Sequence, residues 1–460
     1  MSNFWDYNIW GTFSLFAILL GCLLLGSILR KVTPFLRNSL IPISVIGGGI
    51  LILVSAIYRA FTGESMFDAA FFGGNGTEKL EIITYHALAL GFIASTLRDS
   101  GGKLTKNRLD EIVNTGVTTV STYLVQGILG LGITIIAAGV ITGFFPAAGV
   151  LLPFGYGQGT GQALNYGTIY EIDFGFVGGK SFGLSLAALG FLSASIGGVI
   201  HLNVLRLRKR LKLADKSLFQ KAEQAADEPS AKPITESLDR ITVQIALIAI
   251  VYFATYGIMY LLGLLLPGMR SVIFGFNFLI GVLAAILTKM ILRFLRKKSI
   301  LRREYRDNFL LTRSSNFCFD VMIISGIAAI RLDTLEKYGG LLLLLGILGA
   351  IVTYVYLRVV INKLFPTYRE EQFLMMYGML TGTASTGTIL LREIDGEFET
   401  PATENMIYQN LPAIVLGFPM MLLATLAPKR PYLTLIIFVI FLAALQILLF
   451  RKQIFRRRKK

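Results

Sequence analysis

The residues best suited to chemistry lie in the stretch MYGMLTGTASTGTILLREID at 376–395. It carries five hydroxyl side chains within the eight residues 381–388, interspersed with glycines. A hard monovalent cation needs about five or six neutral oxygens to replace its water. A divalent ion would require Asp or Glu ligands, and the stretch has no acid before Glu393. The alternative is that these hydroxyls bond to carbonyls of their own helix. We expect a sodium site and no divalent-metal site, formed by Thr381, Gly382, Thr383, Ala384, Ser385, Thr386 and Gly387.

A second glycine-rich stretch, LLPFGYGQGTGQALNYGTIYE at 151–171, carries amide side chains. Glycine lets the backbone approach a ligand closely, so we expect the alternating glycines from Gly155 to Gly161 to leave backbone amides outside regular helix bonding. Half-helix N-termini there would offer N–H groups and a positive dipole end to a carboxylate. The alternative is that the glycines serve helix packing. The substrate-binding residues expected in this stretch are Gly157, Gln158, Gly159, Thr160, Gly161, Gln162 and Asn165.

Three polar residues near the first-mentioned stretch are further candidates for binding substrate. Arg392 is suited to pair with a carboxylate bidentately, although it could instead mark the cytoplasmic mouth or pair with Glu393 or Asp395. Gln409 and Asn410 lie on the following span, which contains prolines. Amides buried on a broken helix commonly line a cavity, so we expect both to contact substrate.

The chain lacks the residue combinations of an enzyme. It has no phosphate-binding loop and no nucleophile paired with a histidine. Cys22 and Cys318 lie inside apolar segments and do not form a disulfide framework, and His86 and His201 are too sparse for a metal site. We therefore expect no catalytic residue and no cofactor other than sodium as a coupling ion.

These candidate stretches lie in a chain with the composition of a membrane protein. Apolar residues make up 54% of 460 residues, and charged residues only 16%. The mean hydropathy is +0.65. At roughly 20 apolar residues per crossing, the sequence predicts ten helical spans and an eleventh near the C-terminus. They are expected at 9–30, 40–60, 80–98, 114–143, 181–205, 241–266, 271–295, 314–331, 338–364, 403–428 and 432–450.

The net charge of +16 is distributed by side of the membrane. Alternate connections hold 34 of the 44 Lys and Arg residues, whereas the opposite connections hold eight. This asymmetry follows the positive-inside rule and places the N-terminus outside and the C-terminus in the cytoplasm. It also argues against nucleic acid as a partner, because the charges are not interleaved with exposed aromatic residues. The lipid bilayer is the expected surrounding, and the leader 1–8 lacks the basic region of a cleaved signal peptide.

The order of features is the same in both halves of the chain. Each half has GFIASTLRD at 91–99 or SGIAAIRLD at 325–333, then a long span, a glycine-rich stretch and a final span. Because each half has five spans, the second half must be inserted upside down. We expect this division: residues 1–206, the first half with a re-entrant loop near 146–170; 207–240, a cytoplasmic linker; 241–430, the inverted second half with a re-entrant loop near 372–392; and 431–460, an extra span with a basic cytoplasmic tail. Loops that enter from opposite faces are the arrangement of an inverted-repeat secondary transporter.

The stretch TGTASTGTILLREIDGEFETPATENMIYQN at 381–410 resembles the glutamate:sodium symporter family, and GYGQGTGQALNYG resembles that family's first pore-loop motif. The resemblance extends over the ten-span plan at about 9–428. It implies a sodium-coupled carrier of an acidic amino acid in the cytoplasmic (inner) membrane. It also implies a homodimer that works by an elevator-like movement.

The sequence departs from that family in two places. Gln158 stands where the family usually has a histidine, and the span at 432–450 lies beyond the usual ten. A sodium- or proton-coupled carrier of another di- or tricarboxylate is therefore an alternative. An ion channel or a membrane-embedded interaction scaffold is an alternative from another functional class.

Overall fold

The structure is a computed structural model that describes residues 4–98, 106–207, 239–300, 305–395 and 400–451. The protein is helical over 86% of its residues, and no strand occurs in these ranges. The predicted all-α class is confirmed. The predicted linker 207–240 and the basic tail after Arg451 lie almost wholly outside the described residues.

The longer helices follow the chain in an order that repeats across its two halves. Those of the first half are α1 (Tyr7–Val32), α2 (Pro34–Asn38), α3 (Ile43–Thr62), α4 (Gly76–Leu97), α5 (Lys106–Val140), α6 (Leu151–Phe174) and α7 (Gly179–Leu207). Those of the second half are α9 (Arg240–Leu265), α10 (Arg270–Gly275), α11 (Asn277–Lys297), α12 (Asn308–Ala328), α13 (Leu332–Leu364), α14 (Arg369–Thr381), α15 (Ala384–Arg392), α16 (Ala402–Tyr408) and α17 (Asn410–Leu426), followed by α18 (Pro431–Leu449). Short 3₁₀ turns lie at Met66–Asp68, Ala70–Phe72, Pro146–Val150 and Pro267–Met269.

Local sequence explains where several of these helices begin and end. The Asp307 carboxylate caps α12 by accepting hydrogen bonds from the backbone N–H groups of Phe309 and Leu310. Pro431 opens α18, where a missing N–H costs nothing. Gly175 ends α6 in the left-handed conformation that glycine adopts without strain.

Nine helices in the described part of the chain are long and apolar enough to cross a membrane. The pair α16 and α17, bent by 50°, makes a tenth if it counts as one span. This supports a multi-pass membrane protein. Of the eleven predicted spans, 403–428 is this bent pair. The span predicted at 314–331 corresponds to α12, which is 21 residues long but carries Arg313 and Asp320 and is not counted among the apolar spans.

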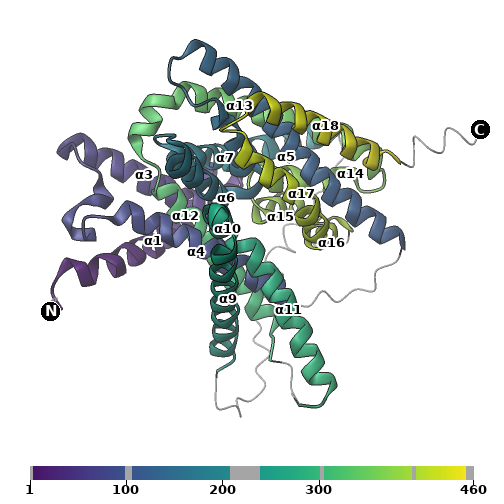
Figure 1. Cartoon of the computed structure of the whole chain (residues 1–460), viewed down its shortest axis with the longest axis horizontal. Helices are drawn as coiled ribbons and strands as arrows, with labels where there is room; N and C mark the ends of the chain where they lie inside the picture. Colours follow the sequence, from purple (N-terminus) through teal and green to yellow (C-terminus); the bar gives the residue numbers. More distant parts are fainter. Residues whose placement is uncertain (1–3, 99–105, 208–238, 301–304, 396–399, 452–460) are drawn as a thin grey trace, which may run out of the picture.

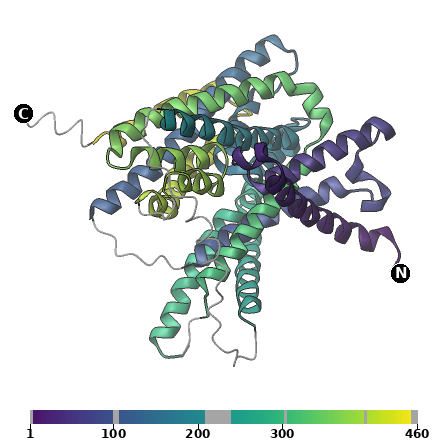
Figure 2. The ribbon, with the colours of Figure 1, turned by 180° about the vertical axis from the view of Figure 1, so that it is seen from behind.

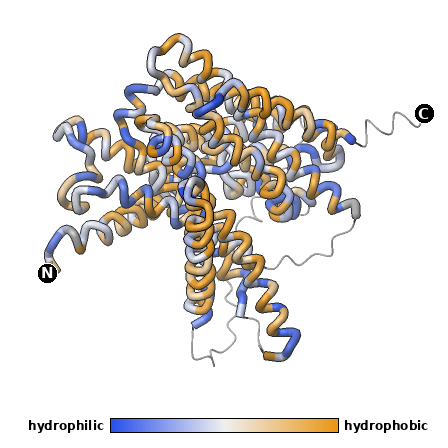
Figure 3. The backbone as a smooth tube through the Cα atoms, viewed as in Figure 1, coloured by the Kyte–Doolittle hydropathy of each residue, from blue (hydrophilic) through white to orange (hydrophobic). Residues whose placement is uncertain are grey.

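Two antiparallel helices, α4 and α12, form the centre of the molecule. Their contact includes a buried hydrogen bond between the hydroxyls of Thr84 and Ser325, and Ser315 donates to the carbonyl of Gly91. Two helical arms leave this centre: α1 with α3, and α9 with α11 (Figures 1 and 2). The arm of α9 and α11 is hydrophobic along most of its length and hydrophilic at its tip (Figure 3).

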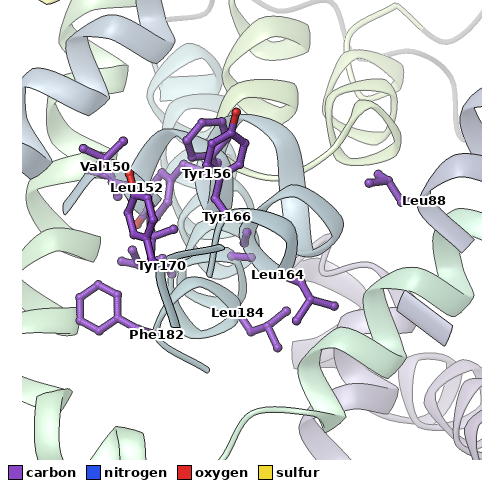
Figure 4. Packing of buried hydrophobic residues seen from close by; sticks show 14 of the residues in the cluster. Leu88, Val150, Leu152, Tyr156, Leu164, Tyr166, Tyr170, Phe182 and Leu184 are labelled. Atoms are coloured by element: carbon purple, nitrogen blue, oxygen red, sulfur yellow. The ribbon is translucent and has the colours of Figure 1, made fainter. Parts of the chain in front are cut away.

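The remaining helices form a larger body in which α5 and α13 pack against each other. Packing pairs recur between the halves: α3 packs on α12 as α11 packs on α4, and α7 packs on α13 as α17 packs on α5. The body contains both glycine-rich stretches, as α6 and as α14 with α15. Its buried aromatic and aliphatic side chains surround α6, including Tyr156, Tyr166 and Tyr170 (Figure 4).

Candidate functional site

The first glycine-rich stretch is a helix that breaks at Gly159. This residue has φ 81° and ψ −174°, whereas the residues on both sides of it are helical. Phe154 and Tyr166 lie on opposite sides of the break, yet their rings stack with centroids 3.7 Å apart. A continuous helix would separate their Cα atoms by about 18 Å. The chain therefore turns sharply at Gly159, and the two segments of α6 fold toward each other.

The second glycine-rich stretch is a helical hairpin. Helix α14 ends at Thr381, Gly382 has the non-helical angles φ −126° and ψ −105°, and Thr383 caps α15. A Cβ built on Gly378 would lie 2.7 Å from the Gly387 Cα, so only glycines allow the two helices to approach this closely.

The two breaks meet at one cavity of about 190 Å³. A Cβ built on Gly159 would lie 3.8 Å from Thr383 Cγ2, which places one break against the other. Eight of the predicted site residues line the cavity: Gly157, Gln158, Gln162, Gly382, Thr383, Ala384, Gln409 and Asn410. Apolar side chains form much of the remaining wall, among them Leu88, Phe92, Phe278, Phe319, Met322 and Met379.

The cavity is walled by amides whose hydrogen-bonding capacity is unused. Gln162 is 1% exposed, and neither its Oε1 nor its Nε2 has a partner among the described residues. Gln409 is 2% exposed and its Oε1 is likewise unpartnered there. Its Nε2 donates to the Asn410 side chain at 3.1 Å. Leaving a buried polar group unpaired costs about 1–3 kcal/mol, so these atoms are suited to receive a polar ligand.

Each break also places a helix N-terminus at the cavity. The second segment of α6 begins at Thr160, and α15 begins at Ala384. The first N–H groups of a helix have no partner within it, and they carry the positive end of its dipole. No charged side chain lines the cavity among the residues that the structure describes. The positive potential at the cavity wall therefore comes from backbone.

The expectation for the glycines of the first stretch is correct only at Gly159. Gly155, Gly157 and Gly161 have helical backbone angles. They allow close packing instead: a Cβ on Gly155 would lie 2.8 Å from the backbone of Ala187, and one on Gly161 would lie 2.7 Å from the Leu88 side chain. Packing, the alternative considered for these glycines, explains three of the four.

The hydroxyls of the second stretch differ in what they bond. Thr381 donates to the Tyr377 carbonyl at 2.7 Å, and Thr388 donates to the Ala384 carbonyl at 2.9 Å, so both bond to their own helices. Thr383 lines the cavity, and its Oγ1 lies 3.3 Å from that of Thr386. The side chain of Ser385 lies outside the described part of the structure.

Other predicted residues lie away from the cavity wall. Asn165 donates to the Gly275 carbonyl at 2.9 Å, and Thr160 donates to the Met322 carbonyl at 3.1 Å. Arg392 ends α15 and is not a lining residue. It is eight residues beyond Ala384, a distance of about 12 Å along a helix.

Sequence reasoning missed Tyr123, which lines the cavity and donates to the Gly157 carbonyl at 3.2 Å. It also missed Gln126, one turn further along α5. A tyrosine and a glutamine three residues apart within an apolar span were the available signal. Asp320, a half-buried carboxylate within α12, gave a similar signal but does not line the cavity.

An ion-pair cluster joins the start of the second hairpin to its neighbours. Glu370 accepts two hydrogen bonds from the Arg358 guanidinium, at 2.6 and 2.8 Å, and it contacts His201 Nε2 at 3.0 Å. Burial disfavours the charged carboxylate, but the hydrogen bonds from His201 and Arg358 prevail and lower the pKa of Glu370 to about 2. This cluster attaches α14 to α7 and α13.

No known protein-family model matches the chain, and no curated protein is detectably similar to it. In the described residues, no group of three or more His, Cys, Asp or Glu side chains is arranged to hold a metal ion.

Proposed function

We propose that the chain is a sodium-coupled symporter of glutamate or a similar acidic amino acid. The observation that carries this proposal is the meeting of two broken helices, one from each half of the chain, at a cavity lined by amides. Secondary transporters use discontinuous helices in this way, with half-helix ends directed at substrate and ions. The likeness of 381–410 to the glutamate:sodium symporter family supports the same function.

The proposed membrane arrangement is a pair of inverted repeats. Each half contributes one broken element, and the packing pairs of α3 with α12 and of α11 with α4 exchange the halves. In this arrangement the two broken elements are re-entrant from opposite faces. The carrier is a homodimer in the cytoplasmic membrane, with its N-terminus outside and its C-terminus in the cytoplasm.

Recognition of substrate follows from the groups at the cavity. The helix N-termini at Thr160 and Ala384 each contribute about half a positive charge, and together they balance the single net negative charge of glutamate. The unpartnered Oε1 atoms of Gln162 and Gln409 accept hydrogen bonds from the ammonium group. Neutral oxygens around Thr383 hold sodium, whose weak binding lets it leave again.

A carrier of another di- or tricarboxylate is the second candidate, because Gln158 lines the cavity in the place of the family's usual histidine. With about one positive charge available from two helix ends, a tricarboxylate would retain excess negative charge in the cavity.

Uptake into liposomes that contain the purified full-length protein tests the proposal. We expect labelled glutamate to accumulate when sodium is higher outside, and not when choline replaces sodium. Unlabelled aspartate, malate and citrate, added singly, report which acids compete. Absence of sodium-dependent accumulation would contradict the proposal, and stronger competition by citrate than by unlabelled glutamate would favour the second candidate.

Counterflow separates a carrier from a channel or scaffold. Liposomes loaded with unlabelled glutamate should take up labelled glutamate faster than empty liposomes when no ion gradient is present. A carrier exchanges substrate one molecule at a time, whereas a channel needs no substrate on the far side.

A further inference from the structure

A polar group lies behind the cavity at the crossing of α5 and α13. Gln126 of α5 is 0% exposed, and its Nε2 donates to the Thr353 hydroxyl of α13 and to the Leu380 carbonyl, both at 2.9 Å. A carbonyl can only accept, so this contact determines which end of the amide faces α14. The other end, Oε1, has no hydrogen-bond partner among the described residues.

The unpartnered oxygen is directed at the first break. Gln126 Oε1 lies 3.4 Å from the position that a Cβ on Gly157 would occupy. Gly157 is among the last residues before the break at Gly159, and Leu380 is among the last before the break at Gly382. Gln126 therefore lies between the C-terminal ends of two interrupted helices.

The electrostatics of this place favour a cation. The last carbonyls of a helix lack intrahelical partners, and they carry roughly half a negative charge together. Two such ends meet around Gln126, whereas the positive ends of the following segments adjoin the cavity. A side-chain oxygen that is buried and unpaired adds a neutral ligand. The described residues offer no carboxylate cluster here, which argues against a divalent ion.

We propose that Gln126 Oε1 is a ligand of a second monovalent-cation position, separate from the oxygens around Thr383. The ion lies between the carbonyl ends of the first segment of α6 and of α14. It offsets the negative ends of both helices and couples the two breaks through α5. This inference rests on the proposed sodium-coupled function and adds a residue and a position to it.

Sodium-dependent stabilisation of the purified full-length protein tests this position. The thermal midpoint is measured against NaCl, with choline chloride keeping ionic strength constant, in the wild type and in a Thr383→Ala background. In both backgrounds, Gln126→Leu should raise the sodium concentration for half-maximal stabilisation by about tenfold or more. An unchanged concentration in either background would overturn the proposal, because a water would then fill the site or both sets of oxygens would hold one ion.

Gln126→Glu keeps an oxygen ligand and provides a readout that a merely structural residue would not move. At pH 8 it should bind sodium at least as tightly as the wild type, and its sodium dependence should weaken toward pH 5 as protons compete. An Oε1 that only shapes the fold would give no such change with pH, and that result would overturn the proposal. This variant also decides the question if Gln126→Leu fails to fold.

Gln244→Leu is the matched control. Gln244 is 1% exposed, but both ends of its amide are paired, with the Tyr305 carbonyl and the Asp307 N–H. It should lower the thermal midpoint without changing the sodium concentration for half-maximal stabilisation. If the wild type shows neither sodium-dependent stability nor uptake, the proposed function itself fails. If the wild type responds to sodium and the Gln126 variants respond equally, only this inference fails.

Discussion

Gly159 and Thr383, 224 residues apart in the sequence, lie against each other where two interrupted helices meet. A Cβ on Gly159 would be 3.8 Å from Thr383 Cγ2, an ordinary van der Waals separation. Neither residue is in a regular helix, so free backbone groups of both breaks surround one cavity. This contact makes each hairpin tip sensitive to changes in the other.

Gly159→Ala should destabilise the protein through backbone strain. Its φ of 81° with ψ near 180° belongs to a region essentially restricted to glycine, and occupying it with alanine costs about 1–3 kcal/mol. Space does not explain the effect, because the nearest atoms lie 3.8 Å from the added Cβ. We expect a lower thermal midpoint of the purified protein and slower uptake. Gly257→Ala is the control, since that helical glycine has open space around it. Equal midpoints for the two variants would contradict a strained break at Gly159.

Gln162→Met should separate binding from stability. The substitution removes two unpartnered polar atoms, so the thermal midpoint should stay the same or rise. The substrate concentration for half-maximal uptake should rise by about tenfold or more, and saturating sodium should not restore it. Asn165→Leu should behave in the opposite way, because it removes a donor to the Gly275 carbonyl, worth about 1 kcal/mol of stability, without touching the cavity. A Gln162 variant with unchanged uptake would exclude this amide from the substrate site.

Thr383→Ala should alter the sodium dependence of uptake. It removes a cavity oxygen, and a lost ligand worth about 1–3 kcal/mol raises the half-maximal sodium concentration by roughly one to two decades. Because ion and substrate binding are linked, higher sodium should recover much of the substrate affinity. Loss of the N-cap of α15 should also cost about 1 kcal/mol of stability.

Thr383→Ser and Thr388→Ala are the matched variants for that experiment. The serine keeps the oxygen and the cap, so it should retain wild-type sodium dependence. Thr388 bonds only within its own helix to the Ala384 carbonyl and to the nearby Met406 sulfur, so its loss should affect sodium dependence little. If Thr383→Ala keeps the wild-type sodium response, the hydroxyl site is wrong.

Acid should weaken the attachment of the second hairpin through Glu370. Its pKa is about 2 in the folded protein and near 4.5 when unperturbed, so the folded state favours the ionised carboxylate. The resulting stabilisation is fully present above about pH 4.5 and is lost as pH falls from there toward 2. The thermal midpoint of the wild type should therefore fall between pH 5 and pH 3.

Glu370→Gln tests this dependence. The variant should be less stable than the wild type at pH 7, and its midpoint should change less between pH 5 and pH 3. The exposed Glu64, replaced by Gln, controls for a general effect of charge. Parallel pH curves for the wild type and Glu370→Gln would show that this cluster does not govern acid stability.

The helical class and most of the membrane spans could be predicted because apolar runs of about 20 residues have few other stable conformations in a bilayer. The locations of both breaks were also predictable to within a few residues. Gly159 lies in the run from Gly155 to Gly161, and Gly382 lies among hydroxyl residues that favour helix caps. Sequence could not separate the one glycine with positive φ from its helical neighbours, because this depends on what each Cα touches.

Only the tertiary structure decided which polar residues share the cavity. Thr381 and Thr383 are two residues apart, yet one bonds within its helix and the other faces the cavity, because the chain stops being helical between them. Tyr123 and Gln126 lie in a span whose apolar pattern hides them, and they gain their role from carbonyls that helix breaks elsewhere in the chain leave available. The sequence by itself determined a helical membrane protein with two interrupted elements. The packing of α5 and α13 between the halves decided that both interruptions meet at one place, since such long-range contacts leave no local pattern.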